Sequence, residues 1–344
     1  MYKQKYINSK NLNTLYKNLQ DDHSKILFEN RLMYSITQNI KYIINENIEG
    51  NNYFKYIKSN IDSSVVVFTS DPHGEFICKT LLNIGIKIDA VYDASLASHN
   101  EKYYHGIRIV SFEELLAEYN DRFIFLANDF RLMQKEVYKL IDNGFSYNRI
   151  VQLKTPIQYF DFVKSNTSKK EIFIDGGSLY GDSIKDFIKW CNNYNKIYAF
   201  EPNKKCYAQL EKAIEHYNIK NILAYNKGLW CTKTKLNFSS GEFGDSEIKK
   251  SGKTRIRVDT IDNVVKNDPI TFIKLNIEGA ELEALKGAYN TIAKNKPVLA
   301  ICLYHKPEDI VDIPIYILNN FNEYKLYIRK YSWFMNRLVL YCIP

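Results

Sequence analysis

Two acidic residues and a pair of glycines stand where predicted strands end. A short apolar run ends in Asp175, and Gly177 and Gly181 follow it in the pattern D-x-G-x-x-x-G. A helical stretch comes next, and a second apolar run then ends in Glu201. Glycines let the backbone turn tightly and let a ligand approach, and an acid at the end of the second strand can accept hydrogen bonds from ribose hydroxyls. The pattern predicts a βαβ unit that binds an adenosine-type ligand.

The spacing of these residues bears on which ligand that is. NAD, FAD and S-adenosylmethionine all present a ribose to such an acid. An acid at the position of Asp175 would repel the pyrophosphate of a dinucleotide, but it suits a ligand that carries a sulfonium and an ammonium group. The pattern therefore favours S-adenosylmethionine, and the alternative is a chance glycine turn in another kind of α/β domain.

Polar residues also follow a later predicted strand. The run 271–276 ends in Asn276, and Glu278 comes just before the next helix, so both are expected at the mouth of the ligand crevice. Glu281, in the first turn of that helix, either takes part in the site or only complements the helix dipole.

A histidine follows the next strand. The apolar run 298–303 leads to His305, which is either structural or, because it can titrate near neutrality, a general base. His305 and Glu308 form H-x-x-E, but two candidate ligands are too few to predict a metal site.

The apolar periodicity predicts three regions. We expect helices in 1–60, a small Rossmann-like α/β domain in 61–155 whose glycine turn retains only Gly74, and the main domain in 165–344, entered through a polar linker at 165–170. We interpret the small domain as a scaffold that docks on the main domain, fixes contacts in a homo-oligomer or shapes one wall of a substrate cleft. A nucleotide-binding role for it is the weaker alternative.

Within the main domain, the remaining patterns predict three further strands and a loop. Residues 233–238 alternate like an edge strand, and 239–252 are expected to form a mobile loop over the cleft. The strand-like runs 324–330 and 338–343 fit the last two strands of a class I methyltransferase sheet, in which seven strands include a final antiparallel one. An NAD-binding domain accommodates such a pair poorly.

Composition limits the class of protein. The 344 residues are 45% hydrophobic and 14% aromatic, which is enough for sizeable cores, and no apolar run is long enough to span a membrane. The N-terminal residues lack the apolar region of a signal peptide. Six scattered cysteines without a C-x-x-C pair indicate buried thiols in a reducing cytoplasm.

The net charge of +8 comes from lysines spread along the chain. Without an arginine-rich stripe and interleaved aromatic residues, nucleic-acid binding is not expected. A solvated lysine-rich surface explains the charge, and the alternative is a mildly basic cleft for a phosphorylated or nucleotide-linked substrate.

Four motifs in order make residues 170–343 resemble the FkbM family of S-adenosylmethionine-dependent methyltransferases. They are FIDGGSLYGDS, AFEPN, FIKLNIEGAELEALKGA and the tail LYHKPEDIVDIPIYI with YKLYIRKYS. Residues 1–150, including DDHSKILFENRLMYS, are similar to the extension that some members carry. The resemblance implies the seven-stranded class I fold preceded by a smaller Rossmann-like domain and N-terminal helices.

The resemblance also implies roles for individual residues. The turn around the methionine part of the cofactor would include Asp175, Gly177 and Gly181, Glu201 would take the ribose, and Asn226 would lie near the adenine. The whole implied cofactor-binding set is Asp175, Gly176, Gly177, Ser178, Tyr180, Gly181, Ser183, Glu201, Pro202, Asn226, Gly228 and Asn276.

One position departs from the family pattern. The family commonly has an aspartate where this sequence has Asn276. If that aspartate accepts the proton, catalysis here rests on Glu278 or His305; if it only holds the cofactor, Asn276 can still do so by hydrogen bonds.

The resemblance implies O-methylation of a sugar or small metabolite, in surface-glycan or natural-product pathways. The Asn276 substitution keeps N-methylation of an amino sugar or amino-acid substituent open. Two other classes remain as alternatives: an NAD-dependent sugar enzyme, and a non-catalytic partner that binds S-adenosylmethionine or substrate.

Overall fold

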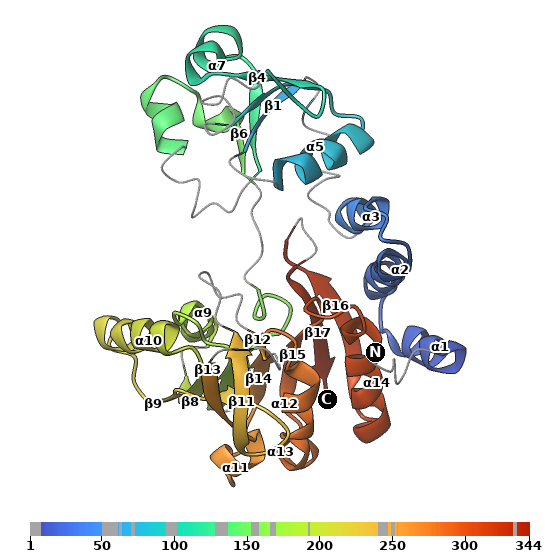
Figure 1. Cartoon of the computed structure of the whole chain (residues 1–344), viewed down its shortest axis with the longest axis vertical. Helices are drawn as coiled ribbons and strands as arrows, with labels where there is room; N and C mark the ends of the chain where they lie inside the picture. The colour runs from blue at the N-terminus through green and yellow to red at the C-terminus, as the bar shows by residue number, and fades with distance from the viewer. Residues whose placement is uncertain are drawn as a thin grey trace. The chain divides into compact units, whose positions relative to one another are not determined.

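A computed structural model describes most of the chain, with gaps. The described residues are 8–49, 61, 64–69, 73–93, 102–127, 137–152, 158–165, 170–191, 193–239, 247–248, 252, 254–332 and 336–344. They divide into two compact units (Figure 1). The first comprises Met1–Phe28, Ile157–Tyr331 and Asn336–Pro344, and the second comprises Glu29–Pro156 and Ser332–Met335. No helix in the described ranges is both long and apolar enough to cross a membrane.

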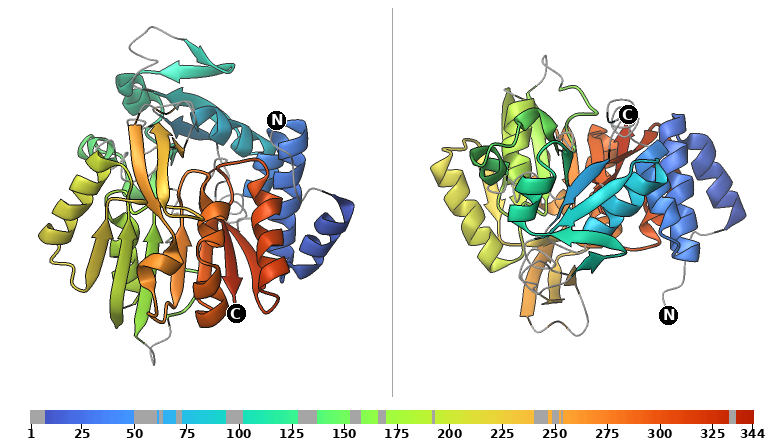
Figure 2. Two further views of the ribbon diagram at one scale, coloured as in Figure 1. Left: turned by 60° about the horizontal axis from the view of Figure 1, so that its bottom comes forward. Right: turned by 90° about the horizontal axis from the view of Figure 1, so that it is seen from above.

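The first unit is built on a seven-stranded sheet with the order β16-β17-β15-β14-β7-β8-β9 (Figures 1 and 2). The strands from β15 to β9 run parallel, whereas β17 is antiparallel to both β15 and β16. The predicted class I methyltransferase sheet is confirmed. Its strands are β7 (Glu171–Gly176), β8 (Tyr194–Phe200), β9 (Ile222–Tyr225), β14 (Phe272–Leu275), β15 (Val298–Cys302), β16 (Lys325–Lys330) and β17 (Leu338–Ile343).

The central strands form where the sequence has continuous apolar runs. All residues of β7 and β14 are buried, as expected for parallel strands covered on both faces. An aromatic cluster fills one face of the sheet, with Phe173 stacked on Phe187 at 4.4 Å between ring centroids. The helices are α9 (Asp182–Trp190), α10 (Lys204–His216), α11 (Ile261–Val265), α12 (Glu281–Lys286), α13 (Tyr289–Asn295) and α14 (Asp309–Asn320).

The N-terminal segment is tied to the edge of this sheet. Helix α1 (Ser9–Asn18) packs against α14 (Figure 1), and Ser24 Oγ accepts a hydrogen bond of 2.9 Å from the backbone N–H of Ile328 in β16. Arg329 donates to Asp21 at 2.6 Å and so adds an ion pair at the same edge. These contacts cover one side of an edge strand that would otherwise be open to pairing with another chain.

A second, four-stranded sheet lies in the chain between β9 and β14. Its order is β10-β13-β11-β12, formed by β10 (Gly228–Leu229), β11 (Thr234–Ser239), β12 (Glu247–Ile248) and β13 (Thr254–Asp259). The predicted strand at 233–238 is confirmed as β11, but β13 and α11 were not anticipated. Of the expected mobile loop at 239–252, residues 240–246 and 249–251 lie outside the described ranges, and 247–248 form β12.

The second unit contains a six-stranded sheet with the order β3-β4-β2-β1-β5-β6. Its pairs are parallel except for β3 with β4. A Ser111–Glu114 capping box begins α7. The elements are α2 (Asp22–Thr37, which begins in the first unit), α3 (Lys41–Glu49), β1 (Val65–Phe68), α5 (His73–Asn83), β2 (Ile88–Tyr92), β3 (Tyr103–Tyr104), β4 (Ile107–Val110), α7 (Phe112–Glu118), β5 (Phe123–Leu126), η1 (Tyr147–Arg149) and β6 (Ile150–Gln152).

Two sequence signals fall wholly or partly in the gaps. In the degenerate glycine turn, residues 70–72 lie outside the described residues, and Gly74 packs closely on Thr69. Residues 166–169 of the polar linker also lie outside them.

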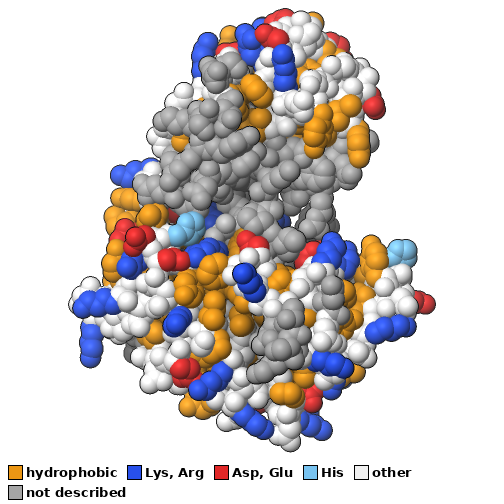
Figure 3. All heavy atoms as spheres, turned by 180° about the vertical axis from the view of Figure 1, so that it is seen from behind, with side chains coloured by type: hydrophobic (Ala, Val, Ile, Leu, Met, Phe, Trp, Pro, Cys, Tyr) orange, Lys and Arg blue, Asp and Glu red, His pale blue; other side chains and the backbone are white. Residues whose placement is uncertain are grey.

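On the face seen in Figure 3, positive and negative side chains of the first unit are interspersed.

Candidate active site

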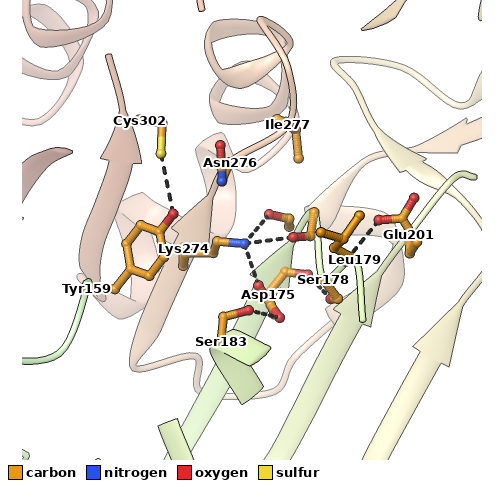
Figure 4. A network of polar contacts seen from close by, with 12 residues as sticks. Tyr159, Asp175, Ser178, Leu179, Ser183, Glu201, Lys274, Asn276, Ile277 and Cys302 are labelled. Atoms are coloured by element: carbon orange, nitrogen blue, oxygen red, sulfur yellow. Dashed lines mark hydrogen bonds and ion pairs between the residues drawn. The ribbon is translucent and has the colours of Figure 1, made fainter. Parts of the chain in front are cut away.

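The turn after β7 is held by a buried ion pair (Figure 4). Nζ of Lys274, in β14, lies 2.9 Å from Oδ1 of Asp175 and donates to the carbonyl oxygens of Gly176 and Gly177 at 3.1 and 2.8 Å. Ser183 Oγ donates to Oδ2 of Asp175 at 2.7 Å. Asp175 is fully buried, and both of its carboxylate oxygens have partners. Because Asp175 has no exposed surface, in this structure it holds the shape of the turn from within the sheet and is not accessible to a ligand.

The glycines of the turn serve different purposes. Gly177 has φ 78°, and a Cβ there would lie 1.9 Å from the carbonyl oxygen of Asn276, so the close approach is made by the chain itself. Gly181 has φ 85° and is the N-cap of α9. A Cβ on Gly176 would lie 2.7 Å from Leu275, which makes that glycine a packing requirement. Ser178 is buried and donates to the Asp175 carbonyl at 2.9 Å.

Glu201, at the end of β8, is aimed at the same turn. Its Oε2 accepts a hydrogen bond from the backbone N–H of Leu179 at 3.0 Å, and its Oε1 accepts one from Asn203 at 2.8 Å. Burial raises the pKa of Glu201, whereas the two amides lower it. Each carboxylate oxygen retains a further acceptor position, so the group can still bind a pair of hydroxyls.

Asn226 follows β9 and faces the neighbouring loop. Its Nδ2 donates to the carbonyl oxygens of Glu201 and Pro202 at 2.9 and 3.2 Å. This fixes the side chain with Oδ1 as the remaining acceptor, which suits an exocyclic amine such as that of adenine. Gly228 lies in β10, paired with Val258, and a Cβ there would lie 3.1 Å from Val258 and 3.7 Å from Pro202.

A cavity of about 900 Å³ opens beside these residues. Tyr180, Pro202 and Asn226, all predicted cofactor contacts, line it together with the start of α10 and strands β11 and β13. Tyr180 is 40% exposed, so its ring is available to a ligand.

Asn276 ends β14 and is fixed by the next strand. The hydroxyl of Tyr304 donates to Oδ1 of Asn276 at 3.0 Å. Burial raises the pKa of Tyr304 far above its usual value, so the phenol remains a donor throughout the physiological range. Asn276 therefore keeps Nδ2 as a free donor group, and this amide is not a proton acceptor.

Glu278 and His305, the two predicted catalytic residues, are brought together. Nε2 of His305 lies 3.4 Å from Oε1 of Glu278, and Nδ1 lies 2.8 Å from Oε1 of Glu281, off the line of a good hydrogen bond. Burial lowers the pKa of His305, but Glu281 and Glu278 raise it more, to about 10. The imidazole is thus an imidazolium at neutral pH, flanked by two carboxylates.

The backbone presents Glu278 to solvent. Glu278 has φ 56° and Gly279 has φ 88°, so two successive left-handed residues turn the chain from β14 into α12. A non-glycine residue in this conformation is strained, and such strain concentrates at functional sites. The Glu278 side chain is 36% exposed, whereas that of Glu281 is fully buried and accepts from the Ile277 amide at 2.8 Å.

A further acid lies next to this cluster. Burial and the Glu281 charge raise the pKa of Asp309 to about 7, against the opposing effect of Lys306. Its Oδ2 accepts from the backbone N–H of Lys306 at 3.0 Å. No group of three or more acidic, histidine or cysteine side chains in the described ranges is arranged to hold a metal ion.

Two residues of this site, Lys274 and Tyr304, were missed from the sequence, whereas Glu281 was left open between a role in the site and a role at the helix dipole. Lys274 interrupts the apolar run FIKL, and a charge inside a buried strand is a signal that it has a buried partner. Tyr304 had a weaker signal, because its contact with Asn276 depends on how β15 packs.

Part of the chain is similar to a known family. Residues 175–331 match the family described as Methyltransferase FkbM domain. No curated protein gives a significant match.

Several solved structures are similar to the chain. The methyltransferase FkbM from Methylobacillus flagellatus KT is 20% identical with a TM-score of 0.47, covering 85% of this chain and 93% of that one. An rRNA methylase from Streptococcus thermophilus is 14% identical (TM-score 0.34; 50% and 85% covered). A Streptococcus mutans protein in complex with SAH is 15% identical (TM-score 0.32; 51% and 89% covered). The identification of the domain rests on the family match.

Proposed function

We propose that this protein is an S-adenosylmethionine-dependent methyltransferase that methylates a hydroxyl or amine of a sugar, a glycan substituent or a small metabolite, because residues 175–331 match the Methyltransferase FkbM domain. The observation that carries this proposal is the meeting of Glu201, the Gly177 turn and the Glu278–His305 pair at the carboxyl ends of β8, β7, β14 and β15. Ligands of such sheets bind at that edge.

The residues present fit the cofactor. Glu201 retains acceptor positions for ribose hydroxyls, Asn226 retains Oδ1 for the adenine amine, and the cavity lies beside Tyr180 and Pro202. When bound, S-adenosylmethionine supplies an electrophilic methyl group. Asp175, Gly176, Gly177, Ser178, Gly181 and Ser183 would shape the turn beside it, and Asn276 would offer an amide donor.

The chain's own part in the reaction is to position the acceptor and to remove its proton. Holding the reacting atoms about 3 Å apart gives most of the gain that proximity can supply. Glu278 is the accessible carboxylate, so it would take the proton from the acceptor hydroxyl or ammonium group. His305, as an imidazolium, would hold Glu278 in place and stabilise its charge before transfer.

The amide of Asn276 favours a second candidate reaction of a methyltransferase, which is N-methylation. An amide cannot accept the proton of an alcohol, and an amine nucleophile needs less help from a base than a hydroxyl does. N-methylation of an amino sugar or amino-acid substituent therefore stands beside O-methylation. A non-catalytic partner that only binds the cofactor would show no turnover with any acceptor.

The deciding experiment is calorimetric titration of the protein with S-adenosylhomocysteine, with NAD in parallel. We expect binding in the micromolar range and no response to NAD. Silence with S-adenosylhomocysteine would refute the assignment of the cofactor site. Mass spectrometry with a panel of hydroxyl and amine acceptors would then separate O-methylation from N-methylation.

The place of action is part of the proposal. We propose a cytoplasmic enzyme of surface-glycan or natural-product synthesis. All six cysteines are unpaired and five are buried, which is the pattern of a reducing compartment.

A further inference from the structure

The cavity beside Tyr180 has a wall of cationic side chains. Its lining includes five lysines and arginines but no aspartate or glutamate among the residues described around it. The five cations are Lys204, Lys205, Lys235, Arg255 and Arg257. The chain as a whole mixes charges of both signs, so this concentration of one sign inside a concave site is a local feature.

Two of these cations face each other across paired strands. Lys235 of β11 is the register partner of Arg257 of β13 in an antiparallel pair. Like charges in directly opposite positions destabilise a sheet. Arg255, two residues before Arg257, projects from the same face of β13. Phe238, Ile256 and Val258 alternate with these cations along the strands and form a small core, and Phe238 and Ile256 also line the cavity.

A second unfavourable arrangement borders the same cavity. Lys204 and Lys205 occupy the first turn of α10, a 13-residue helix with no acidic residue in that turn. Positive side chains at this end oppose the helix macrodipole. The start of α10 and the β11–β13 pair belong to different elements, yet both add positive charge to one cavity.

Nothing in the described ranges neutralises this wall. None of the five cations lies within ion-pair distance of a carboxylate there, whereas the nearby Lys227 pairs with Asp259 at 3.0 Å. Among the described acids, Asp259 at the end of β13 pairs with Lys227 and not with a cation of the wall. An anionic ligand would relieve both unfavourable arrangements at once.

We propose that this wall is a phosphate-binding subsite that holds the phosphoryl groups of the methyl acceptor, a sugar phosphate or a nucleotide-linked sugar. The proposal rests on the proposed methyltransferase function. Arginine guanidinium groups match phosphate oxygens in a bidentate manner, and lysines add point charges. The cavity of about 900 Å³ has the size of a ligand site, and its lining includes both the proposed cofactor contacts Tyr180, Pro202 and Asn226 and these cations.

The test is calorimetric titration with UDP, ADP, CDP, GDP and inorganic pyrophosphate, each with and without saturating S-adenosylhomocysteine. The variant is Arg255→Gln with Arg257→Gln. The matched control is Lys212→Gln with Lys233→Gln, which removes two exposed charges from α10 and from the residue before β11, outside the cavity lining. Thermal unfolding of each variant shows whether it is folded.

We expect at least one of these anions to bind in the presence of S-adenosylhomocysteine, and more weakly as salt rises. The arginine variant should lose at least about tenfold in affinity, because two charge-assisted contacts are removed, while the control changes by less than about twofold. S-adenosylhomocysteine affinity should be the same in all three proteins. If pyrophosphate binds as tightly as the nucleotides, the result supports a sugar phosphate as the acceptor. If one nucleotide binds more tightly than pyrophosphate, the result supports a nucleotide-linked sugar.

Three other outcomes would overturn the subsite. If the control variant loses as much anion affinity as the arginine variant, only net charge matters. If S-adenosylhomocysteine displaces the anion, the wall belongs to the cofactor site, and if the protein binds single-stranded RNA but none of the small anions, the wall is not a phosphate subsite for a small acceptor. Arginine-dependent anion binding in a protein that does not bind S-adenosylhomocysteine would leave the subsite standing and refute the proposed function alone.

Discussion

Lys274 and Asp175 form an ion pair between β14 and β7, with Nζ 2.9 Å from Oδ1 and both side chains almost completely buried. The two residues are 99 positions apart in the chain. Because Lys274 also donates to the carbonyl oxygens of Gly176 and Gly177, the pair couples the pairing of two central strands to the shape of the turn.

Removing one partner of this pair should be costly. Lys274→Met leaves the Asp175 carboxylate buried without its counter-ion, and we expect the free energy of unfolding to fall by about 3–5 kcal/mol. Adding Asp175→Asn should restore part of the loss. The control Lys196→Met removes a half-exposed pair with Asp268 and should cost no more than about 1 kcal/mol. Urea unfolding measures all three, and equal losses in the two lysine variants would contradict the prediction.

The Gly177 position should not tolerate a side chain. Gly177→Ala combines a left-handed backbone with a contact of 1.9 Å to a carbonyl oxygen, so we expect a loss of more than about 2 kcal/mol in the free energy of unfolding. Gly181→Ala has a similar φ, but its nearest neighbour is the flexible side chain of Leu210 at 3.1 Å, so it should lose less. If both variants unfold at the same urea concentration, the close approach of Asn276 is not the reason for the glycine.

Glu201→Ala should affect both binding and stability. It removes the proposed ribose acceptor and leaves the Leu179 and Asn203 amides without partners. We expect S-adenosylhomocysteine to bind at least about tenfold more weakly and the free energy of unfolding to fall by about 1–3 kcal/mol. Calorimetry and urea unfolding check the two effects. Unchanged affinity would show that Glu201 only organises the turn.

Glu278→Gln should separate catalysis from cofactor binding. The substitution keeps the size of the side chain but removes the proposed proton acceptor, so kcat should fall by about 100-fold or more while S-adenosylhomocysteine affinity stays the same. The matched control is Glu283→Gln in the following helix, whose carboxylate pairs with Lys286. A full kcat in Glu278→Gln would move the proton acceptor elsewhere.

The charge of His305 should appear in the pH dependence of stability. Its pKa rises from 6.5 to about 10 on folding, so the imidazolium adds stability that is fully present below pH 6.5 and is lost as the pH approaches 10. The stability difference between the wild type and His305→Gln should therefore shrink over this range. Urea unfolding above about pH 8 avoids the titration of Asp309, whose pKa is about 7. The exposed His216→Gln serves as the control.

Much of the main sheet could be predicted from the sequence, because its central strands are continuous apolar runs that parallel pairing buries on both faces. Glu201 and Asn226 could be placed at one edge because both directly follow such runs. The small sheet was only partly predictable. Strand β13 has the sequence TRIRVD, in which three of six residues are charged. A strand with one solvent-exposed face is predicted only by alternation of apolar and polar residues, and six residues are too few to make that alternation distinct.

The arrangement within the site was less accessible to sequence reasoning. Asp175 was expected to face the cofactor, but Lys274 and Ser183 occupy its carboxylate, and that partnership joins residues far apart in the chain. His305 was expected to titrate near neutrality, whereas two carboxylates shift its pKa to about 10. The roles of both residues therefore depend on neighbours that only folding brings together.

The sheet β10-β13-β11-β12 is an insertion between β9 and β14, and its ladder hydrogen bonds are made among its own strands. Replacing Lys235, Arg255 or Arg257 therefore leaves the pairing of the seven-stranded sheet intact. We expect relatives to diverge most on this inserted wall, since natural selection can adapt it to a new acceptor without rebuilding the methyl-transfer machinery. For the same reason it is the first region to randomise in a directed-evolution library for altered acceptor choice.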